Sequence, residues 1–198
     1  MKKIMPLVAA ACMAVVAGPA LSQAGPTPVR GTLASVSSDA IAVKGKDGKT
    51  TQIALAPNYR VAMLKPISIE AIQPGSFIGT AEIPGKNGTG RSLEVHILPP
   101  GSPSGHFPWN LKPGSMMTNG TVGTVKTQGH GREIDVSYPT GTRHITVPAN
   151  VPIVQFGAGD PSMLKVGIPI FTVPMAKPGG GLVTGLVAVG ENGAAPPM

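Results

Sequence analysis

The chain has 198 residues, of which 41% are hydrophobic, 4% aromatic and 13% charged, and its formal net charge is +7. Its basic residues are scattered singly with few aromatic neighbours, which argues against a nucleic-acid-binding surface. The 27 glycines and 22 prolines fall between regular runs of Val, Ile and Leu, a pattern typical of many short strands joined by turns.

Residues 1–24 have the pattern of an export signal. A pair of lysines precedes a short apolar stretch from Ile4 to Gly18, and Ala20–Ser22 and Ser22–Ala24 both offer a small-residue cleavage site. The apolar stretch is shorter than the roughly 20 residues that a membrane-spanning helix needs. We therefore expect a soluble protein exported to the bacterial periplasm, with no transmembrane span.

The single cysteine, Cys12, lies inside this signal. A lipoprotein would carry its lipid on such a cysteine, but the preceding Ala9–Ala11 does not match the usual leucine-led lipobox. Cleavage after Ala24 would remove Cys12 and two lysines, which leaves 14 basic and 9 acidic residues and a net charge of +5. The mature chain would then have no disulfide, and its stability would depend on core packing.

The rest of the chain contains an internal duplication, and such repetition of a whole β-rich unit is a strong indicator of architecture. Three pairs of segments align: Val29–Val36 with Thr118–Val125 at an offset of 89 residues, and Ile53–Asn58 with Ile145–Asn150 and Ile72–Ile78 with Leu164–Ile170 at an offset of 92.

In the first repeat, residues 28–98, the Asp47-Gly48 pair predicts a hairpin turn, and Ser68–Ile72 predicts a short turn before Pro74-Gly75. The expected strands are Val29–Val36, Ala40–Lys44, Thr50–Leu55, Ser76–Ile83 and Ser92–Leu98. In the second repeat, residues 118–190, they are Gly120–Lys126, Glu133–Tyr138, Arg143–Val147, Ile168–Val173 and Leu182–Val189.

Each repeat thus has about five strands in roughly 70 residues. An open sheet of this size would expose an apolar face and two edges, and closure into a small barrel removes both problems. We predict an all-β protein of two tandem small OB-like β-barrels, joined by a Pro-rich bridge at residues 99–117 and followed by a disordered tail at residues 191–198.

The shared pattern is a glycine-containing first strand, a hairpin, a mid-unit Pro-Gly step at Pro74-Gly75 and a final strand. It resembles a family of small exported bacterial β-barrel domains of unknown function, similar in architecture to periplasmic OB-fold proteins. The resemblance covers both repeats and implies a fold and an exported location. It supplies no catalytic motif.

The bridge, Pro99–Met117, contains five prolines and the only tryptophan, so it cannot be a helix or a central strand. Its His106, Met116 and Met117 are candidate ligands for Cu(I), because thioether and imidazole groups suit this soft ion. Trp109 is a candidate cation–π partner for the metal.

This set resembles the His, Met and Trp set of small periplasmic copper chaperones with an OB-like barrel. In those proteins the ligands lie closely spaced on barrel strands, whereas here a Pro-Gly step separates them, and adjacent methionines of an extended segment point to opposite sides. The alternative is that Trp109 and the methionines fill the gap between the barrels.

Other chemical signals are weaker. His96, His130 and His144 have no partners at metal-like spacing. Gly101–Gly105 resembles a nucleophile elbow but has proline where the serine is required. Glu133 and Asp135 share one strand face, which indicates a solvated surface.

The leading hypothesis is an exported, non-catalytic binding or accessory protein whose partner is an envelope protein or a small ligand. The first alternative is a periplasmic copper carrier, and the second is a hydrolase whose residues meet only in three dimensions. A binding module predicts an exposed apolar or basic groove, whereas an enzyme predicts a pocket with clustered ionisable groups.

Overall fold

A computed structural model describes residues 27–99 and 101–198, which form thirteen β-strands and four short 3-10 turns. The predicted all-β class is confirmed, and no helix in these residues is long and apolar enough to cross a membrane. The expected signal and Cys12 lie outside the described residues.

The strands in chain order are β1 (Val29–Val36), β2 (Ala40–Lys44), β3 (Thr50–Pro66), β4 (Phe77–Pro84), β5 (Gly90–Ile97), β6 (Gly105–Pro108), β7 (Met116–Gln128), β8 (Gly131–Tyr138), β9 (Gly141–Val147), β10 (Ile153–Ala158), β11 (Pro169–Thr172), β12 (Met175–Ala176) and β13 (Leu182–Gly190). The 3-10 turns are η1 (Ile69–Ala71), η2 (Lys86–Gly88), η3 (Pro161–Met163) and η4 (Glu191–Gly193).

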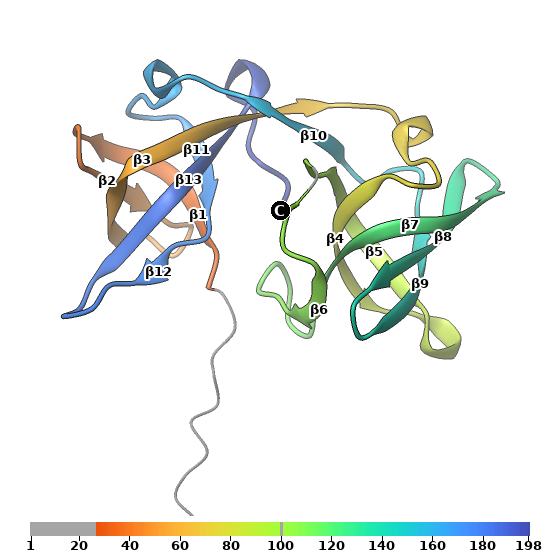
Figure 1. The fold of residues 1–198 in the computed structure, drawn as a ribbon. Helices are drawn as coiled ribbons and strands as arrows, with labels where there is room; N and C mark the ends of the chain where they lie inside the picture. Colours follow the sequence, from red (N-terminus) through yellow and green to blue (C-terminus); the bar gives the residue numbers. More distant parts are fainter. Residues whose placement is uncertain (1–26, 100) are drawn as a thin grey trace, which may run out of the picture.

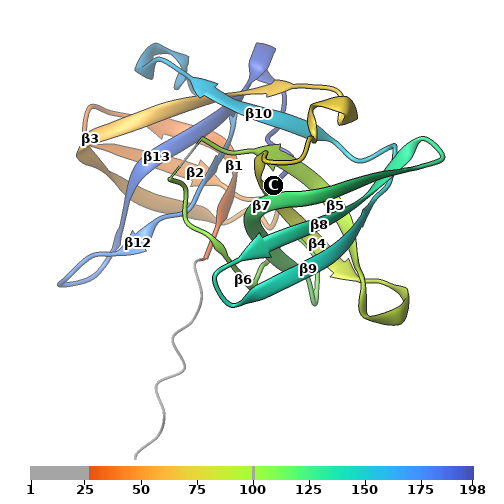
Figure 2. The same ribbon diagram turned by 45° about the vertical axis from the view of Figure 1, so that its right-hand side comes forward.

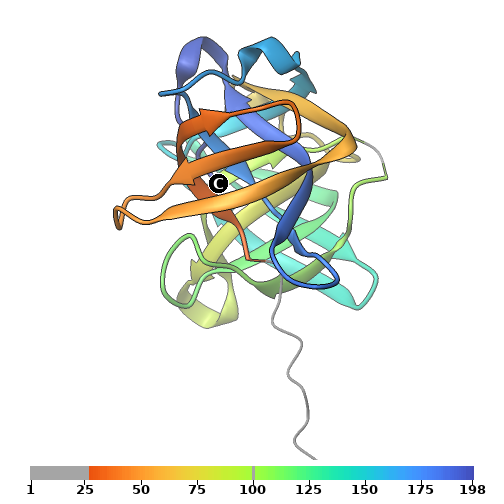
Figure 3. The ribbon, with the colours of Figure 1, turned by 90° about the vertical axis from the view of Figure 1, so that its left-hand side faces the viewer.

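Five strands close into a first ring, which we call ring 1 (Figure 1). Antiparallel pairing joins β1 to β2 and β11, β2 to β3, and β11 to β13. The ring closes where β13 pairs in parallel with β3. Figure 3, in which this ring faces the viewer, shows β3 and β13 crossing its near side.

Ring 2 has the same plan. Its strand β4 pairs with β5 and β7, β7 with β8, and β8 with β9, all antiparallel. The parallel pair between β5 and β9 closes the ring. The bridge contributes the short strand β6, which pairs with the first residues of β7 (Figure 2).

Neither ring is built from one repeat. Ring 1 takes three strands from the first repeat and two from the second, and ring 2 takes the reverse. The prediction of two tandem barrels, each closed within its own repeat, is therefore not confirmed. The reason lies in β3, which was expected to end at Leu55 but continues to Pro66 and carries the chain across to ring 2.

The two repeats are related by an approximate two-fold axis. Strand β3 pairs antiparallel with β10, and Leu64 lies opposite Phe156, the residue 92 positions later. The parallel pair β5–β10 is the equivalent of the parallel pair β3–β13. The residues that face each other in one pair correspond to those in the other after a shift of 92 positions. The first repeat therefore gives strands to ring 2 in the same way as the second repeat gives strands to ring 1.

Each ring has its own aliphatic core. The ring 1 core contains Leu33, Ile41, Val43, Ile53, Leu55, Val61, Leu164, Ile170, Val187 and Val189. The ring 2 core contains Ile72, Ile78, Val95, Val122, Ile134, Val136, Ile145, Val147 and Ile153. A third cluster contains Ala62, Leu64, Val154, Phe171, Ala188 and Met198, with Trp109, Phe156 and Val173 packed against it. We call this cluster the inter-ring core, because it joins residues of ring 1 strands to residues of β10, the bridge and the C-terminal segment, which lie between the rings.

The residues after β13 were expected to form a disordered tail, but in the structure they pack against the rings. They begin with η4, and the side chain of Met198 is buried in the inter-ring core. Figure 1 shows this end of the chain between the two rings. Apolar side chains such as Met198 explain the packing, because they lose contact with water there.

Candidate functional site

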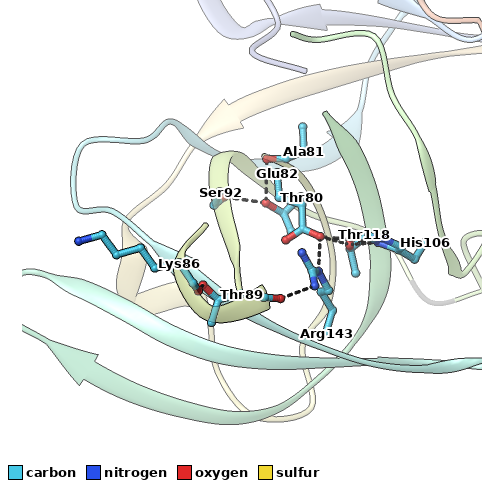
Figure 4. Close-up of polar contacts among 10 residues, drawn as sticks. Thr80, Ala81, Glu82, Lys86, Thr89, Ser92, His106, Thr118 and Arg143 are labelled. Atoms are coloured by element: carbon cyan, nitrogen blue, oxygen red, sulfur yellow. Dashed lines mark hydrogen bonds and ion pairs between the residues drawn. The ribbon is translucent and has the colours of Figure 1, made fainter. Parts of the chain in front are cut away.

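Charged side chains meet inside one end of ring 2 (Figure 4). The carboxylate of Glu82, on β4, is 1% exposed and accepts a hydrogen bond from Nε of Arg143 on β9 at 2.7 Å. The hydroxyl of Thr118, on β7, donates to the same oxygen at 3.2 Å. Arg143 also donates from Nη1 to the carbonyl of Gly88 at 2.7 Å. The buried negative charge is therefore paired with a guanidinium.

A glycine makes room for this carboxylate. A Cβ added to Gly90, on β5, would lie 1.3 Å from Oε2 of Glu82, so no other residue fits there without moving the glutamate. Oε2 itself has no hydrogen-bond partner among the described residues. Glu82 is thus held by one of its oxygens only.

His106 closes the cluster from β6. Its Nδ1 lies 2.8 Å from Oγ1 of Thr118 and 3.6 Å from Oε1 of Glu82, and its ring stacks on Tyr138 with centroids 5.9 Å apart. With the Thr118 hydroxyl donating to Glu82, the His106 tautomer that fits these contacts carries its proton on Nδ1. Burial lowers the pKa of His106, which Glu82 raises and Arg143 lowers. Burial is the largest of these effects, so it favours the neutral form of His106.

A hydroxyl pair lies deeper in the ring. Thr80 and Ser92 are 2.6 Å apart, and both donate to the carbonyl of Glu94. Ring 1 has the same arrangement, in which Thr172 and Thr184 donate to the carbonyl of Leu186. Because both rings have it beside a register shift, this pair belongs to the fold and does not mark a site.

A second buried carboxylate faces the inter-ring core. Glu94 accepts from the backbone N–H of Ala81 at 2.8 Å and lies 2.9 Å from Nδ1 of His96. The His96 ring meets the edge of Phe156 at 5.8 Å. Both carboxylate oxygens of Glu94 thus have a hydrogen-bond partner, which is what a buried carboxylate requires.

The two-fold relation shows that these charges belong to ring 2 alone. The residues of ring 1 at the positions of Glu82, Glu94, His96, Thr118 and Arg143 are Pro174, Leu186, Ala188, Val29 and Thr51. The same strand plan therefore carries a polar cluster in one ring and apolar or uncharged residues in the other.

The predicted copper ligands are placed on neighbouring strands. Met116 and Met117 are successive residues of β7, opposite Pro108 and Phe107 of β6, so their side chains point to opposite faces of the strand. Met117 is 2% exposed, and the Nδ1 of His106 faces Thr118. The structure does not bring the three side chains together around one point, and the copper site stays a prediction.

The ring of Trp109 packs in the inter-ring core. Its ring contacts Phe107 and Phe171, with centroids 6.0 and 6.2 Å away, and the guanidinium of Arg30 lies over it at 5.6 Å. Its cation–π partner in the structure is thus an arginine of the chain.

An apolar cleft of about 320 Å³ opens between β3, β10 and the C-terminal segment. It is lined by Leu64, Pro66, Ile67, Val151, Pro152, Ile153, Val154, Gly190, Ala194, Ala195, Pro196 and Pro197. None of these lining residues is titratable. The cleft and the charged cluster are therefore separate features.

Sequence reasoning missed Glu82, Arg143 and Arg30. Glu82 and Arg143 are 61 residues apart and belong to different repeats, so no local spacing indicates their contact. An alignment of the repeats contains the available signal, because Glu82 of the first repeat stands opposite Pro174 of the second, and Arg143 of the second stands opposite Thr51 of the first.

No protein-family model matches the chain, and searches of curated proteins and of solved structures gave no significant match.

Proposed function

We propose that this chain is a non-catalytic binding or accessory protein of the bacterial envelope, and that its inter-ring cleft receives an uncharged, apolar ligand. In this proposal residues 1–24 direct export to the periplasm, and the two rings are small OB-like barrels. The ligand would contact both repeats at once, because Leu64 and Val154 line the cleft from β3 and β10.

The observation that carries the proposal is the separation of the cleft from the ionisable groups. Catalytic sites combine a pocket with acids, bases or nucleophiles of perturbed pKa. Here the cleft lining has no such group, while Glu82 and Glu94 are buried elsewhere and paired with Arg143 and His96. Apolar lining and a volume near the lower end of ligand pockets favour binding without chemistry.

The test uses N-phenyl-1-naphthylamine, an uncharged probe whose fluorescence rises in apolar surroundings. Ala195 is an exposed residue of the cleft lining, and Ala195→Trp should fill the cleft. Ala34→Trp, at an exposed position on β1, is the matched control. We expect the control to bind like the wild type and Ala195→Trp to lose at least about tenfold in affinity. Equal binding by the two variants, or none by the wild type, would contradict the proposal.

A further inference from the structure

The last residues of the chain adopt an extended form suited to recognition. The backbone of Ala194 has φ −61° and ψ 146°, the geometry of a polyproline II helix. Pro196 and Pro197 follow, and each proline fixes its own φ near the same value. Such a segment loses little conformational entropy when it is bound.

This segment, Ala194–Met198, is seated between the rings. Its prolines form one wall of the cleft, and Met198 is 1% exposed and packs with Leu64, Val154 and Phe171. Leu64 and Val154 also line the cleft. The segment and the open cleft therefore lie in one continuous apolar groove, which we call the inter-ring groove.

Arg30 anchors the end of the segment. Its Nε donates to the carbonyl of Met198, and its Nη1 donates to Asn110. The guanidinium lies 5.6 Å from the Trp109 ring centroid and 5.5 Å from that of Phe171. Burial lowers the pKa of Arg30, and the charge of Glu94 acts in the opposite direction. The guanidinium thus has two hydrogen-bond acceptors and lies against two aromatic rings.

Two of the donors at this anchor are unused. Nη2 of Arg30 and Nε1 of Trp109 are buried and have no hydrogen-bond partner among the described residues. Buried donors are normally paired, so the anchor has capacity for a further acceptor oxygen beyond the Met198 carbonyl. An apolar groove that ends in two unused donors beside aromatic rings suits an extended peptide with a carbonyl or carboxylate at that end.

Among the described residues, this groove is not repeated at the two-fold-related position. At the two-fold-related positions Asn119 replaces Arg30, Gly79 replaces Phe171 and His96 replaces Ala188. A Cβ at Gly79 would lie 2.1 Å from Nε2 of His96, so His96 occupies the space there. Within residues 27–99 and 101–198 the groove therefore has no two-fold-related counterpart.

We propose that the inter-ring groove is a recognition site for an extended, proline-containing apolar peptide, and that residues 194–198 are its resident occupant. The inference rests on the proposed function and names its ligand class. The resident segment covers the Arg30 end of the groove, and an incoming peptide of the same chemistry replaces it there. Partner binding is thus in competition with the chain's own segment.

The experiment uses a fluorescein-labelled peptide with the sequence of residues 193–198 and the full mature protein. Met198→Gly removes the buried side chain of the resident segment and should release it. We expect the peptide to bind Met198→Gly at least about tenfold more tightly than the wild type, because the tethered segment competes at a high effective concentration. Adding Arg30→Ala to Met198→Gly should abolish that binding, whereas adding Arg60→Ala, at an exposed position on β3, should leave it unchanged.

Equal binding by the wild type and Met198→Gly would overturn the inference, and so would binding that is insensitive to Arg30→Ala. If Met198→Gly does not fold, amide hydrogen exchange in the wild type replaces it: excess peptide should accelerate exchange at Ala194, Ala195 and Met198, and unchanged exchange contradicts the inference. The naphthylamine probe separates the two proposals. If the wild type binds the probe but no protein binds the peptide, the apolar cleft stands and the peptide inference is wrong.

Discussion

The two rings follow the same plan but contain different chemistry. Both have an aliphatic core of equivalent residues and a hydroxyl pair beside a register shift. Ring 2 alone buries Glu82, Glu94 and His96 and receives an additional strand, β6, from the bridge. Features found at equivalent positions of both rings therefore specify the fold. The buried charges and the extra strand occur in ring 2 alone, so their presence needs a separate explanation.

For the charges of ring 2, that explanation starts with the bridge. Thr118 links His106 of β6 to Glu82, so the cluster fastens the bridge to the ring. The bridge then continues to Trp109, which packs against Phe171 from the other ring. In this way the polar cluster positions an aromatic residue that the inter-ring groove uses.

The largest effect that distinguishes the rings is expected at Arg143. Arg143→Met leaves the Glu82 carboxylate buried without its cation, and breaking a buried pair in this way costs about 3 kcal/mol. Thr51→Val changes the equivalent position of ring 1, which faces Val43 as Arg143 faces Val136, and should change stability by less than about 1 kcal/mol. Urea unfolding measures both. Similar losses in the two variants would contradict the assignment of the charges to ring 2.

A second pair of variants tests what the rings share. A Cβ added to Gly31 would lie 2.2 Å from the carbonyl oxygen of Lys44, and one added to Gly120 would lie 2.2 Å from that of Ser137. Gly31→Ala and Gly120→Ala should each cost roughly 2 kcal/mol through overpacking, as measured by urea unfolding. A large loss at one glycine with none at the other would break the equivalence of the rings.

The smallest expected effect is the pH dependence contributed by His106. Its pKa in the folded state is lowered by burial, so the unfolded chain binds this proton more readily. The contribution to stability is complete above the ordinary histidine pKa of about 6.5 and is lost as the pH falls through that value toward the lowered one. His106→Gln should reduce the loss of stability on acidification, measured as the urea midpoint at about pH 7.5 and about pH 5. His130→Gln, in the exposed turn after β7, should leave that loss unchanged; an equal change in both variants argues against the role of His106.

The sequence predicted ten of the thirteen strands in the described residues and missed β6, β10 and β12. It could not predict which repeat each strand joins. Alternating apolar residues and the turn at Asp47-Gly48 give the strand pattern, and the structure contains the expected hairpin. Ile78 and Ile170 hold equivalent positions in the two cores, so either would satisfy either ring. The apolar pattern is therefore the same for tandem and exchanged rings.

The deciding residues lie in β3. Pro57 and Asn58 indicate a turn by their chemistry, yet the strand passes through them. Neither residue is in the register of β3 with β2, β10 or β13, so the missing N–H of Pro57 costs no pairing there. Because β3 continues, it cannot fold back on its own repeat. Only this continuation brings Glu82 of the first repeat and Arg143 of the second repeat into the same ring.

The exchange of strands is tested most directly by a pair of engineered disulfides, since Cys12 is the only native cysteine. Ala54 of β3 is the register partner of Val183 of β13, and neighbouring strands lie about 4.8 Å apart, within the range of a disulfide. Arg91 is the residue of the first repeat equivalent to Val183. Exchanged rings predict that mild oxidation links the Ala54→Cys, Val183→Cys variant and leaves the Ala54→Cys, Arg91→Cys variant reduced. The opposite result would show that each repeat closes on itself and would contradict the account.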